Sequence, residues 1–360
     1  MAGGSTSRRA VVAAELYTEA DRLWILLADP REPEEPRVAR LPIRLRELEV
    51  AAELVRSGEL TSVAAEVVIG VCNRLLAGLQ PLLEGTGGSE GTGTGVGALV
   101  LAPHGPLHFL PLGAAETRAG TALAEALPVA TVPSTSFLRR LAAGGAERGL
   151  QPACAALLAG PDLGGEELVA GVAEALSFRL QSVLPEGRLR VLERPAKLEP
   201  GTAVAIVAHG RAGSGGSGQS RLLMRDRRGR PAWIGADRVA ASLGPAAFAF
   251  LSVCRSSTAA VGADDEPTGL VWPLLAGGCR CVVSSLWDVE PTAAAAFAAR
   301  FFDSLHEGET AGRALGRAMG RQRGDPRFPN LRDWGGFVLY GDWRWRLNRR
   351  AAPGRSRSGS

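Results

Sequence analysis

Lysine is almost missing from this sequence. An excess of positive charge is missing from residues 1–342, which form the body of the chain. Lys197 is the single lysine among 41 basic residues, a bias typical of a GC-rich genome rather than of selection for phosphate contacts. The formal net charge is +4, but residues 343–360 hold six arginines and no acid, so the charge falls from +4 to −2 without them. Because the body has no basic excess, we expect no binding to nucleic acid.

Long apolar runs and a cysteine framework are also absent. No run of roughly 18 or more uncharged apolar residues could span a membrane, and the first residues lack the apolar core of a signal peptide. The five cysteines are odd in number and have no framework spacing, which favours a reducing compartment. We therefore expect a cytoplasmic protein that makes no membrane contact.

Motifs for metal, nucleotide and serine chemistry are missing as well. Cys279 and Cys281 are too close in sequence to act as a zinc pair, and no histidine cluster joins them. The glycine-rich residues 213–220 lack the G-K-[ST] of a phosphate-binding loop, and no G-x-S-x-G nucleophile elbow joins a predicted strand to a helix. We expect no metal, no other cofactor and no serine hydrolase.

The chain does contain apolar residues in short, regularly spaced groups. Hydrophobic residues make up 46% and charged residues 22%, which is typical of a soluble globular protein. Residues 11–42 predict a hairpin and a third strand, and residues 44–58 and 61–85 predict two helices, the second with Thr61 at its N-cap. Residues 85–97 hold seven glycines in thirteen positions, which is typical of a linker or a long loop.

From residue 98 onward, short apolar strands alternate with helices such as 164–184 and 291–305. The predicted strands are residues 98–103, 129–133, 153–160, 189–194, 203–208, 248–253 and 279–287. Continuous apolar strands between helices predict an α/β fold, with a mostly parallel sheet covered by helices on both faces. The predicted organisation is an N-terminal hairpin and helices (1–84), a glycine-rich linker (85–97), the α/β domain (98–342) and a basic disordered tail (343–360).

Two of the predicted strands end on residues that carry chemistry. His209 follows the strand 203–208, and Cys254 follows the strand 248–253. Ligands bind beyond the carboxyl ends of parallel strands, so these two side chains are expected to share one crevice. A thiolate is a strong nucleophile, and an imidazole can accept its proton. Gly210 adds a backbone N–H without a side chain, a candidate oxyanion donor beside the N–H of Cys254.

The remaining cysteines and histidines have simpler interpretations. A buried cysteine is usually inert, and Cys72, Cys154, Cys279 and Cys281 lie in apolar stretches that predict packing roles. A second His-Gly pair begins at His104, but a proline follows it, so His104 is interpreted as a turn residue. His108 lies within "LHFLPL", which is typical of a packed core. The end of a strand and the matching His209 distinguish Cys254 from these residues.

Six stretches in fixed order resemble one known family. They are "GPLHFLPLGAA", "AHGRAG", "LLMRDRRGRPAWIGADRV", "FAFLSVCRSSTAAVG", the run from Gly269 to Leu315, and "WGGFVLYGD". Together they resemble the CHAT domains, which are caspase-like peptidase domains related to separase and often attached to TPR repeats. The resemblance covers residues 98 to 342, and the N-terminal hairpin and helices resemble the region that precedes such domains.

The resemblance implies a caspase-like fold, a His209–Cys254 dyad and cleavage of protein substrates, and Gly210 falls at the family's oxyanion glycine. Three departures are visible. Ala205 stands where the family often has another histidine, "SVCRSS" replaces the usual "S-A-C-x-T-G", and the chain holds no TPR array. None of them removes a member of the dyad, but substrate choice or regulation must come from elsewhere, such as a protein partner.

The expected function is that of a cytoplasmic cysteine endopeptidase acting on protein or peptide substrates. Two alternatives stay open: a catalytically silent interaction module with the same fold, and an acyltransferase or thioesterase that uses the same dyad. The first is disfavoured because both dyad residues are present. The second is disfavoured because the chain has no coenzyme-binding motif.

Asp288 is the candidate substrate-binding residue. Separase-like relatives prefer a basic residue before the cut, read by an acid, and Asp288 follows the predicted strand 279–287. A carboxylate there would bind an arginine through charge-assisted, bidentate hydrogen bonds. The alternative role for Asp288 is to cap the helix that begins near Pro291. The acids of "GADDEPTG", which are Asp264, Asp265 and Glu266, are a rival source of negative charge.

Overall fold

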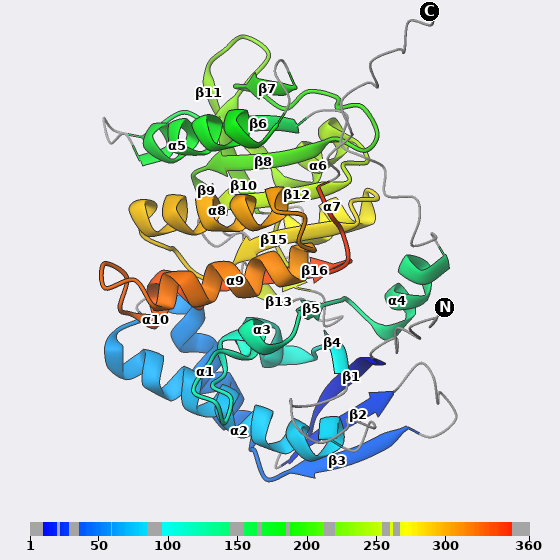
Figure 1. The fold of residues 1–360 in the computed structure, drawn as a ribbon. Coiled ribbons are helices and arrows are strands. Elements are labelled where there is room, and N and C mark those ends of the chain that lie inside the picture. Colours follow the sequence, from blue (N-terminus) through cyan, green and yellow to red (C-terminus); the bar gives the residue numbers. More distant parts are fainter. Residues whose placement is uncertain are drawn as a thin grey trace, which may run out of the picture.

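An eleven-stranded sheet runs through the whole molecule (Figure 1). The computed structural model describes residues 10–19, 22–28, 36–58, 60–84, 96–143, 155–163, 168–184, 188–211, 220–253, 260–261 and 267–347. In spatial order the strands are β3 (Arg37–Leu41), β2 (Arg22–Ala28), β1 (Ala10–Glu19), β4 (Val96–Ala102), β5 (Val129–Thr131), β16 (Phe337–Gly341), β15 (Cys281–Ser285), β12 (Phe248–Val253), β8 (Ala203–Ala208), β6 (Ala155–Ala159) and β7 (Leu189–Leu192).

Most neighbouring strands are parallel, as the apolar runs predict. The run β15-β12-β8-β6-β7 is parallel throughout, and so is β1-β4-β5-β16. Antiparallel pairing is confined to β1-β2-β3 and to β15-β16. Every residue of β8 is buried, because helices cover both faces of this part of the sheet. The prediction of an α/β fold with a mostly parallel sheet is confirmed.

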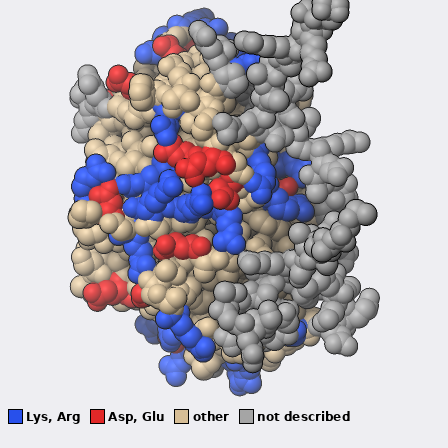
Figure 2. Space-filling model, viewed as in Figure 1, with Lys and Arg blue, Asp and Glu red and all other residues tan. Residues whose placement is uncertain are grey.

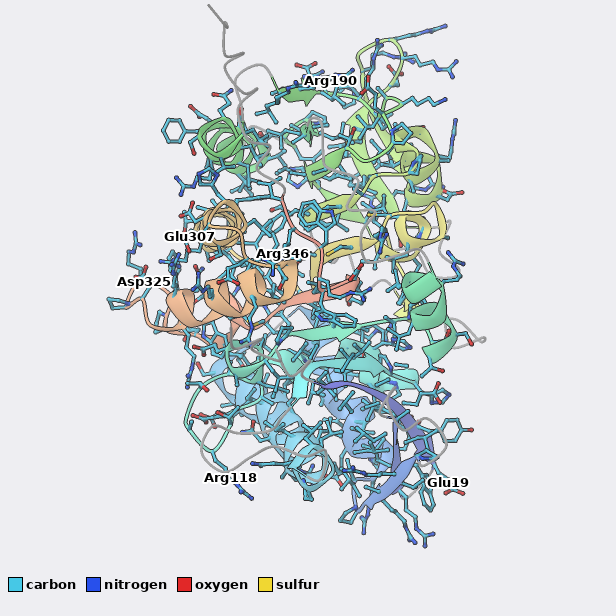
Figure 3. The ribbon with its side chains drawn as sticks, turned by 45° about the vertical axis from the view of Figure 1, so that its right-hand side comes forward. Glu19, Arg118, Arg190, Glu307, Asp325 and Arg346 are labelled. Atoms are coloured by element: carbon cyan, nitrogen blue, oxygen red, sulfur yellow. The ribbon has the colours of Figure 1, made fainter. Side chains whose placement is uncertain are left out.

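Two helical layers flank the sheet. On one face lie α5 (Leu168–Val183), α8 (Pro291–His306) and α9 (Ala311–Arg323), and on the other lie α6 (Ala236–Leu243) and α7 (Val271–Ala276). Successive residues of a strand point to opposite faces, so Ala205 and Val207 of β8 pack in the first layer's core, whereas Val204 and Ile206 pack in the second. Figure 3, turned by 45°, shows the sheet between the two layers.

The surface of the α8–α9 layer carries charges of both signs. Figure 2 shows basic and acidic side chains together across this face. Arg317 pairs with Glu307 at 2.8 Å and with Glu309 at 3.3 Å, and the Arg346 guanidinium donates to the carbonyl of Gly308. Figure 3 labels Glu307 and Arg346 on this side of the molecule. Arginines paired with acids in this way do not form a basic patch of one sign.

The N-terminal strands and helices extend the main sheet. The hairpin β1–β2 pairs through β1 with β4, and α1 (Leu45–Ser57) and α2 (Ser62–Glu84) pack against it. The Thr61 hydroxyl accepts from the Ala64 N–H at 3.2 Å, which confirms the predicted cap of α2.

In length and composition Ser62–Pro81 could cross a membrane, a test that core helices of soluble proteins also meet. Most of the predicted linker, residues 85–95, lies outside the described residues.

Strand β16 was not predicted, and the residues directly after it are packed in the core. It inserts between β5 and β15 and runs antiparallel to β15. Beyond it Trp343 and Trp345 are buried, and the Trp345 ring lies 4.4 Å from that of Phe248. The tail predicted from residue 343 therefore begins too early, because two buried indoles keep the chain in the core through at least that point.

Shorter elements complete the described residues. They are the 3-10 helices η1 (Gly105–Phe109) and η2 (Leu112–Ala114), the helices α3 (Leu123–Ala126), α4 (Thr135–Ala143) and α10 (Leu331–Trp334), and the strands β9 (Gly210–Arg211), β10 (Arg221–Arg225), β11 (Pro231–Gly235), β13 (Ala260–Val261) and β14 (Pro267–Thr268). Strands β9, β10 and β11 form a small antiparallel sheet of their own.

Three cysteines lie in the core, as predicted. Cys72, Cys279 and Cys281 are buried, and burial raises the pKa of each thiol, that of Cys279 to about 12. Such thiols stay protonated and unreactive near neutral pH. Cys154 lies outside the described residues.

The contact between α9 and α3 gives a prediction about stability. A Cβ on Gly316 would lie 1.9 Å from the Ala124 carbonyl oxygen, so Gly316→Ala must push the two helices apart. We expect it to lower the free energy of unfolding by about 2 kcal/mol in urea titrations. Gly171→Ala on α5 is the matched control, since nothing lies within 4 Å of its Cβ position. We expect the control to gain about 0.5 kcal/mol, because alanine favours a helix more than glycine does. Equal losses in both variants would contradict the prediction.

Candidate active site

The ends of β8 and β12 lie side by side at one edge of the sheet. The two strands are parallel and in register from Phe248–Ala203 to Val253–Ala208. His209 is the next residue after Ala208, and position 254 comes next after Val253. Cys254 itself lies outside the described residues, as do Asp264, Asp265 and Glu266. The structure therefore describes the histidine of the predicted dyad and the strand that leads to its cysteine.

The His209 side chain faces a carboxylate that the sequence analysis did not identify. Its Nε2 lies 3.7 Å from the Oδ1 of Asp162, and both side chains are mostly buried, with 17% and 19% exposed. Nε2 is itself buried and has no partner within hydrogen-bonding distance among the described residues. Asp162 follows β6, the neighbour of β8 on the side away from β12. A sequence signal existed, because Asp162 follows an apolar strand just as His209 does.

Strand β10 crosses beside the ends of β6 and β8 and holds the backbone of both segments. The Leu223 N–H donates to the carbonyl of His209 at 3.0 Å. The Leu223 carbonyl lies 2.3 Å from where a Cβ on Gly160 would be, so only glycine fits there. Beyond Gly210, the Arg211 guanidinium lies 4.6 Å from the centre of the Trp233 ring. His209 and the segment leading to Asp162 are thus fixed by one strand.

The orientation of Gly210 follows from that same hydrogen bond. The peptide bond is trans, so the N–H of Gly210 points opposite to the carbonyl of His209. Because that carbonyl points at Leu223 of β10, the Gly210 N–H points away from β10. This donor is therefore not used in the pairing of β9 with β10.

A cavity of about 310 Å³ opens beside His209 on the α5–α8 side of the sheet. Both His209 and Asp288 line it, so the structure brings these two predicted residues to one cavity. Glu290 and Arg332 add further charges, and residues of α5 and α8 supply apolar walls. Ser252, the second last residue of β12, also lines it. A cavity with apolar walls and a few charged groups is suited to hold one side chain of a ligand.

The cap of α8 is Glu290 and not Asp288. The Glu290 carboxylate accepts from the Ala293 N–H at 3.0 Å, so the capping role weighed for Asp288 belongs to Glu290. Burial opposes ionisation of Glu290, yet hydrogen bonds from Thr292 and Ala293 and the charge of Arg332 hold its pKa below the usual value. Asp288 therefore does not cap α8, and it lines the cavity beside Glu290.

Trp287 holds the backbone of Arg332, which lines the cavity. Its indole N–H donates to the Arg332 carbonyl at 2.8 Å, which ties α10 to the end of β15. A Cβ on Gly336 would lie 2.6 Å from the indole ring, so the chain between α10 and β16 passes directly against it. Within the described residues, no group of three or more His, Cys, Asp or Glu side chains could hold a metal ion.

Comparisons with known proteins agree with this architecture. A family model described as the CHAT domain matches residues 71–342. Two crystal structures of the Saccharomyces cerevisiae separase–securin complex, at 13% identity, match 92% of this chain and 30% of theirs, with TM-scores of 0.59 and 0.58. The Arg-specific cysteine proteinase gingipain R matches at 11% identity over 83% of this chain and 74% of its own, with a TM-score of 0.44. No curated protein matches in sequence.

The separase match shows the fold alone, because the identity is low. The chain spans about a third of the length of the separase chain that it matches. The family match ends at the residue predicted for the end of the α/β domain, but it begins inside α2. Apart from the start of the tail, the predicted domain boundaries stay a prediction.

Glu290 gives a prediction about pH. Its pKa in the folded chain is below 4.5, so its ionised form adds stability above that pH, and the gain is lost as the pH falls through the lowered pKa. We expect Glu290→Gln to be less stable than the wild type by about 0.5 kcal/mol at neutral pH. The difference should shrink as urea titrations move from about pH 7 to about pH 3.5. A difference that grows toward acid pH would have the wrong sign.

Proposed function

Because the chain belongs to the CHAT domain family, we propose that it is a cysteine endopeptidase in which Cys254 is the nucleophile and His209 its base. The observation that carries this proposal is the register of β8 and β12, which pairs Ala208 with Val253 directly before the two residues. Residues 248 and 250 pack toward α5 and α8, and Ser252 lines the same cavity as His209. The strand that leads to Cys254 therefore ends beside the cavity that His209 lines.

The proposed reaction begins when His209 takes the proton of the Cys254 thiol. The thiolate attacks the scissile carbonyl, and the carbonyl π electrons move to its oxygen. His209 then gives its proton to the leaving amine, and an acyl-enzyme forms. Water, deprotonated by His209, attacks the thioester and releases the acid and the thiol. Atoms and protons balance with water as the only co-reactant.

The negative oxygen of each tetrahedral intermediate needs donors already in position. We assign this role to the N–H groups of Gly210 and Cys254. The proposal is supported at Gly210 by the trans peptide that turns its N–H away from β10, which leaves the donor unused in that pairing. The absence of a side chain lets a substrate carbonyl approach it closely.

Substrate choice is assigned to Asp288. The cavity beside His209 holds two carboxylates and one guanidinium, and Glu290 is already engaged with α8 and Arg332. We propose that the Asp288 carboxylate, which lines the cavity beside His209, binds the guanidinium of an arginine, or less strongly a lysine, before the scissile bond. We therefore propose cleavage after basic residues.

A protein partner is proposed as the regulator. The separase of similar fold was crystallised with securin. By analogy we propose that a second protein binds this chain and controls its activity. A cytoplasmic location is likewise part of the proposal.

The proposal is tested by reading new protein N-termini. Wild-type protein incubated with a proteome should create new N-termini, and Cys254→Ala and His209→Ala should create none because each removes half of the dyad. Cys72→Ala is the matched control, since its buried thiol has no role in catalysis. N-termini that appear equally with Cys254→Ala would disprove the cysteine mechanism. None with the wild type, with or without cell extract as a source of partner, would favour the silent interaction module.

Asp288 is tested with a peptide library. We expect the wild type to cleave after arginine or lysine, and Asp288→Asn to lose that preference by about 100-fold or more in kcat/KM, because a buried site built for a charge is left unmatched. Alkylation of Cys254 by iodoacetamide should be retained in the variant, which shows that the dyad is intact. Asp237→Asn on α6, on the opposite face of the sheet, is the control. Cleavage by the wild type after aspartate or leucine would refute the assignment.

A further inference from the structure

We propose that Asp162 is a positioning residue for His209. This inference rests on the proposed function, since it gives the base of the dyad a fixed partner. It adds a residue that neither the family match nor the sequence motifs single out. The juxtaposition is direct, with His209 Nε2 at 3.7 Å from Asp162 Oδ1.

The Asp162 carboxylate is held in place from behind. Its Oδ1 accepts from the Val169 N–H at 2.6 Å, and its Oδ2 accepts from the Ala170 N–H at 3.0 Å. These are N–H groups of the first turn of α5, which the helix cannot satisfy itself. A carboxylate with two charge-assisted hydrogen bonds keeps one orientation and its negative charge.

The backbone that carries Asp162 is also fixed. The Gly160 N–H donates to the Val207 carbonyl at 2.8 Å, which continues the pairing of β6 with β8 past the last residue of β6. The space at Gly160 is closed by the Leu223 carbonyl, and the neighbouring Leu223 N–H holds His209. Asp162 and His209 are therefore mounted on adjacent strands and braced by the same residue.

Nε2 of His209 is the atom that needs this partner. It is buried and makes no hydrogen bond in the described residues, and the nearest charge to it is Asp162. A shift of under 1 Å would turn the 3.7 Å contact into a hydrogen bond, and such bonds are often long before a substrate binds. Asp162 then keeps the proton on Nε2 in the neutral ring, which leaves Nδ1 as the ring nitrogen that can accept a proton.

The consequence for the dyad is electrostatic. When the Cys254 proton moves to Nδ1, the ring becomes an imidazolium, and the nearby Asp162 carboxylate stabilises that cation. The ion pair of thiolate and imidazolium is thus favoured over the neutral dyad. Without Asp162 the ring loses both the preference for one tautomer and the stabilising charge.

The test compares Asp162→Asn and Asp162→Ser with the wild type. Asparagine retains one side-chain oxygen of similar reach as an acceptor for α5, serine has a shorter hydroxyl, and both lack the charge. With a fluorogenic peptide that has arginine before the scissile bond, we expect kcat to fall at least about tenfold with KM changed less than about twofold. Alkylation of Cys254 by iodoacetamide, which needs no substrate, should slow by a similar factor.

Thr310→Ala provides the matched control for a lost helix cap. The Thr310 hydroxyl accepts from the Arg313 N–H at the start of α9, away from the cavity. We expect this variant to lower the melting temperature while kcat and the alkylation rate per folded molecule stay at the wild-type values. The Asp162 variants should lose both rates beyond any loss of folded protein.

Two results would overturn the inference. One is a kcat per folded molecule, in both Asp162 variants, within about twofold of the wild type. The other is a loss of activity in both that only follows the loss of folded protein. Failure of the proposed function looks different, because His209→Ala would then keep the wild-type alkylation rate of Cys254 and the wild-type cleavage.

Discussion

The register of three parallel strands is the constraint on which the rest of the structure depends. Parallel pairing of β6, β8 and β12 brings their carboxyl ends to one edge. Every residue of β8 is buried, so a slip by one residue would exchange the side chains that pack in the α5–α8 core with those that pack in the α6–α7 core. The segments after these strands carry Asp162, His209 and Cys254. The interior of the sheet thus determines which polar side chains meet at its edge.

The strands and the histidine were predictable because their signals are local. Apolar runs bounded by glycine or polar residues located β8 and β12 to the residue, and the polar residue after each run gave His209 and Cys254. The cap at Thr61 is equally local, because its hydroxyl accepts from the N–H of Ala64, three residues along the chain. In each case the cause lies within a few positions of the effect. The CHAT resemblance added the family but not the positions of these strands.

The features that were not predicted depend on contacts between distant segments. Strand β16 lies between β5 and β15, and burial of Trp343 and Trp345 depends on residues such as Phe248 almost a hundred positions earlier. Asp162 comes close to His209 only because β6 pairs with β8. Glu290 rather than Asp288 caps α8 because of where the helix begins, and helix boundaries are read from sequence only to within a few residues. Tertiary packing decides each of these points.

The position of β16 has a consequence for how the protein is made. In the described sheet β16 is the strand that joins the N-terminal group, which ends at β5, to the group from β15 to β7. Among the described strands of this sheet it is also the last in sequence, so a ribosome must have released residues up to Gly341 before the two groups can form one sheet. Until then each group has an edge strand whose backbone N–H and C=O groups are unpaired, the kind of surface that chaperones protect. The eleven-stranded sheet can therefore be completed only after β16 has been synthesised.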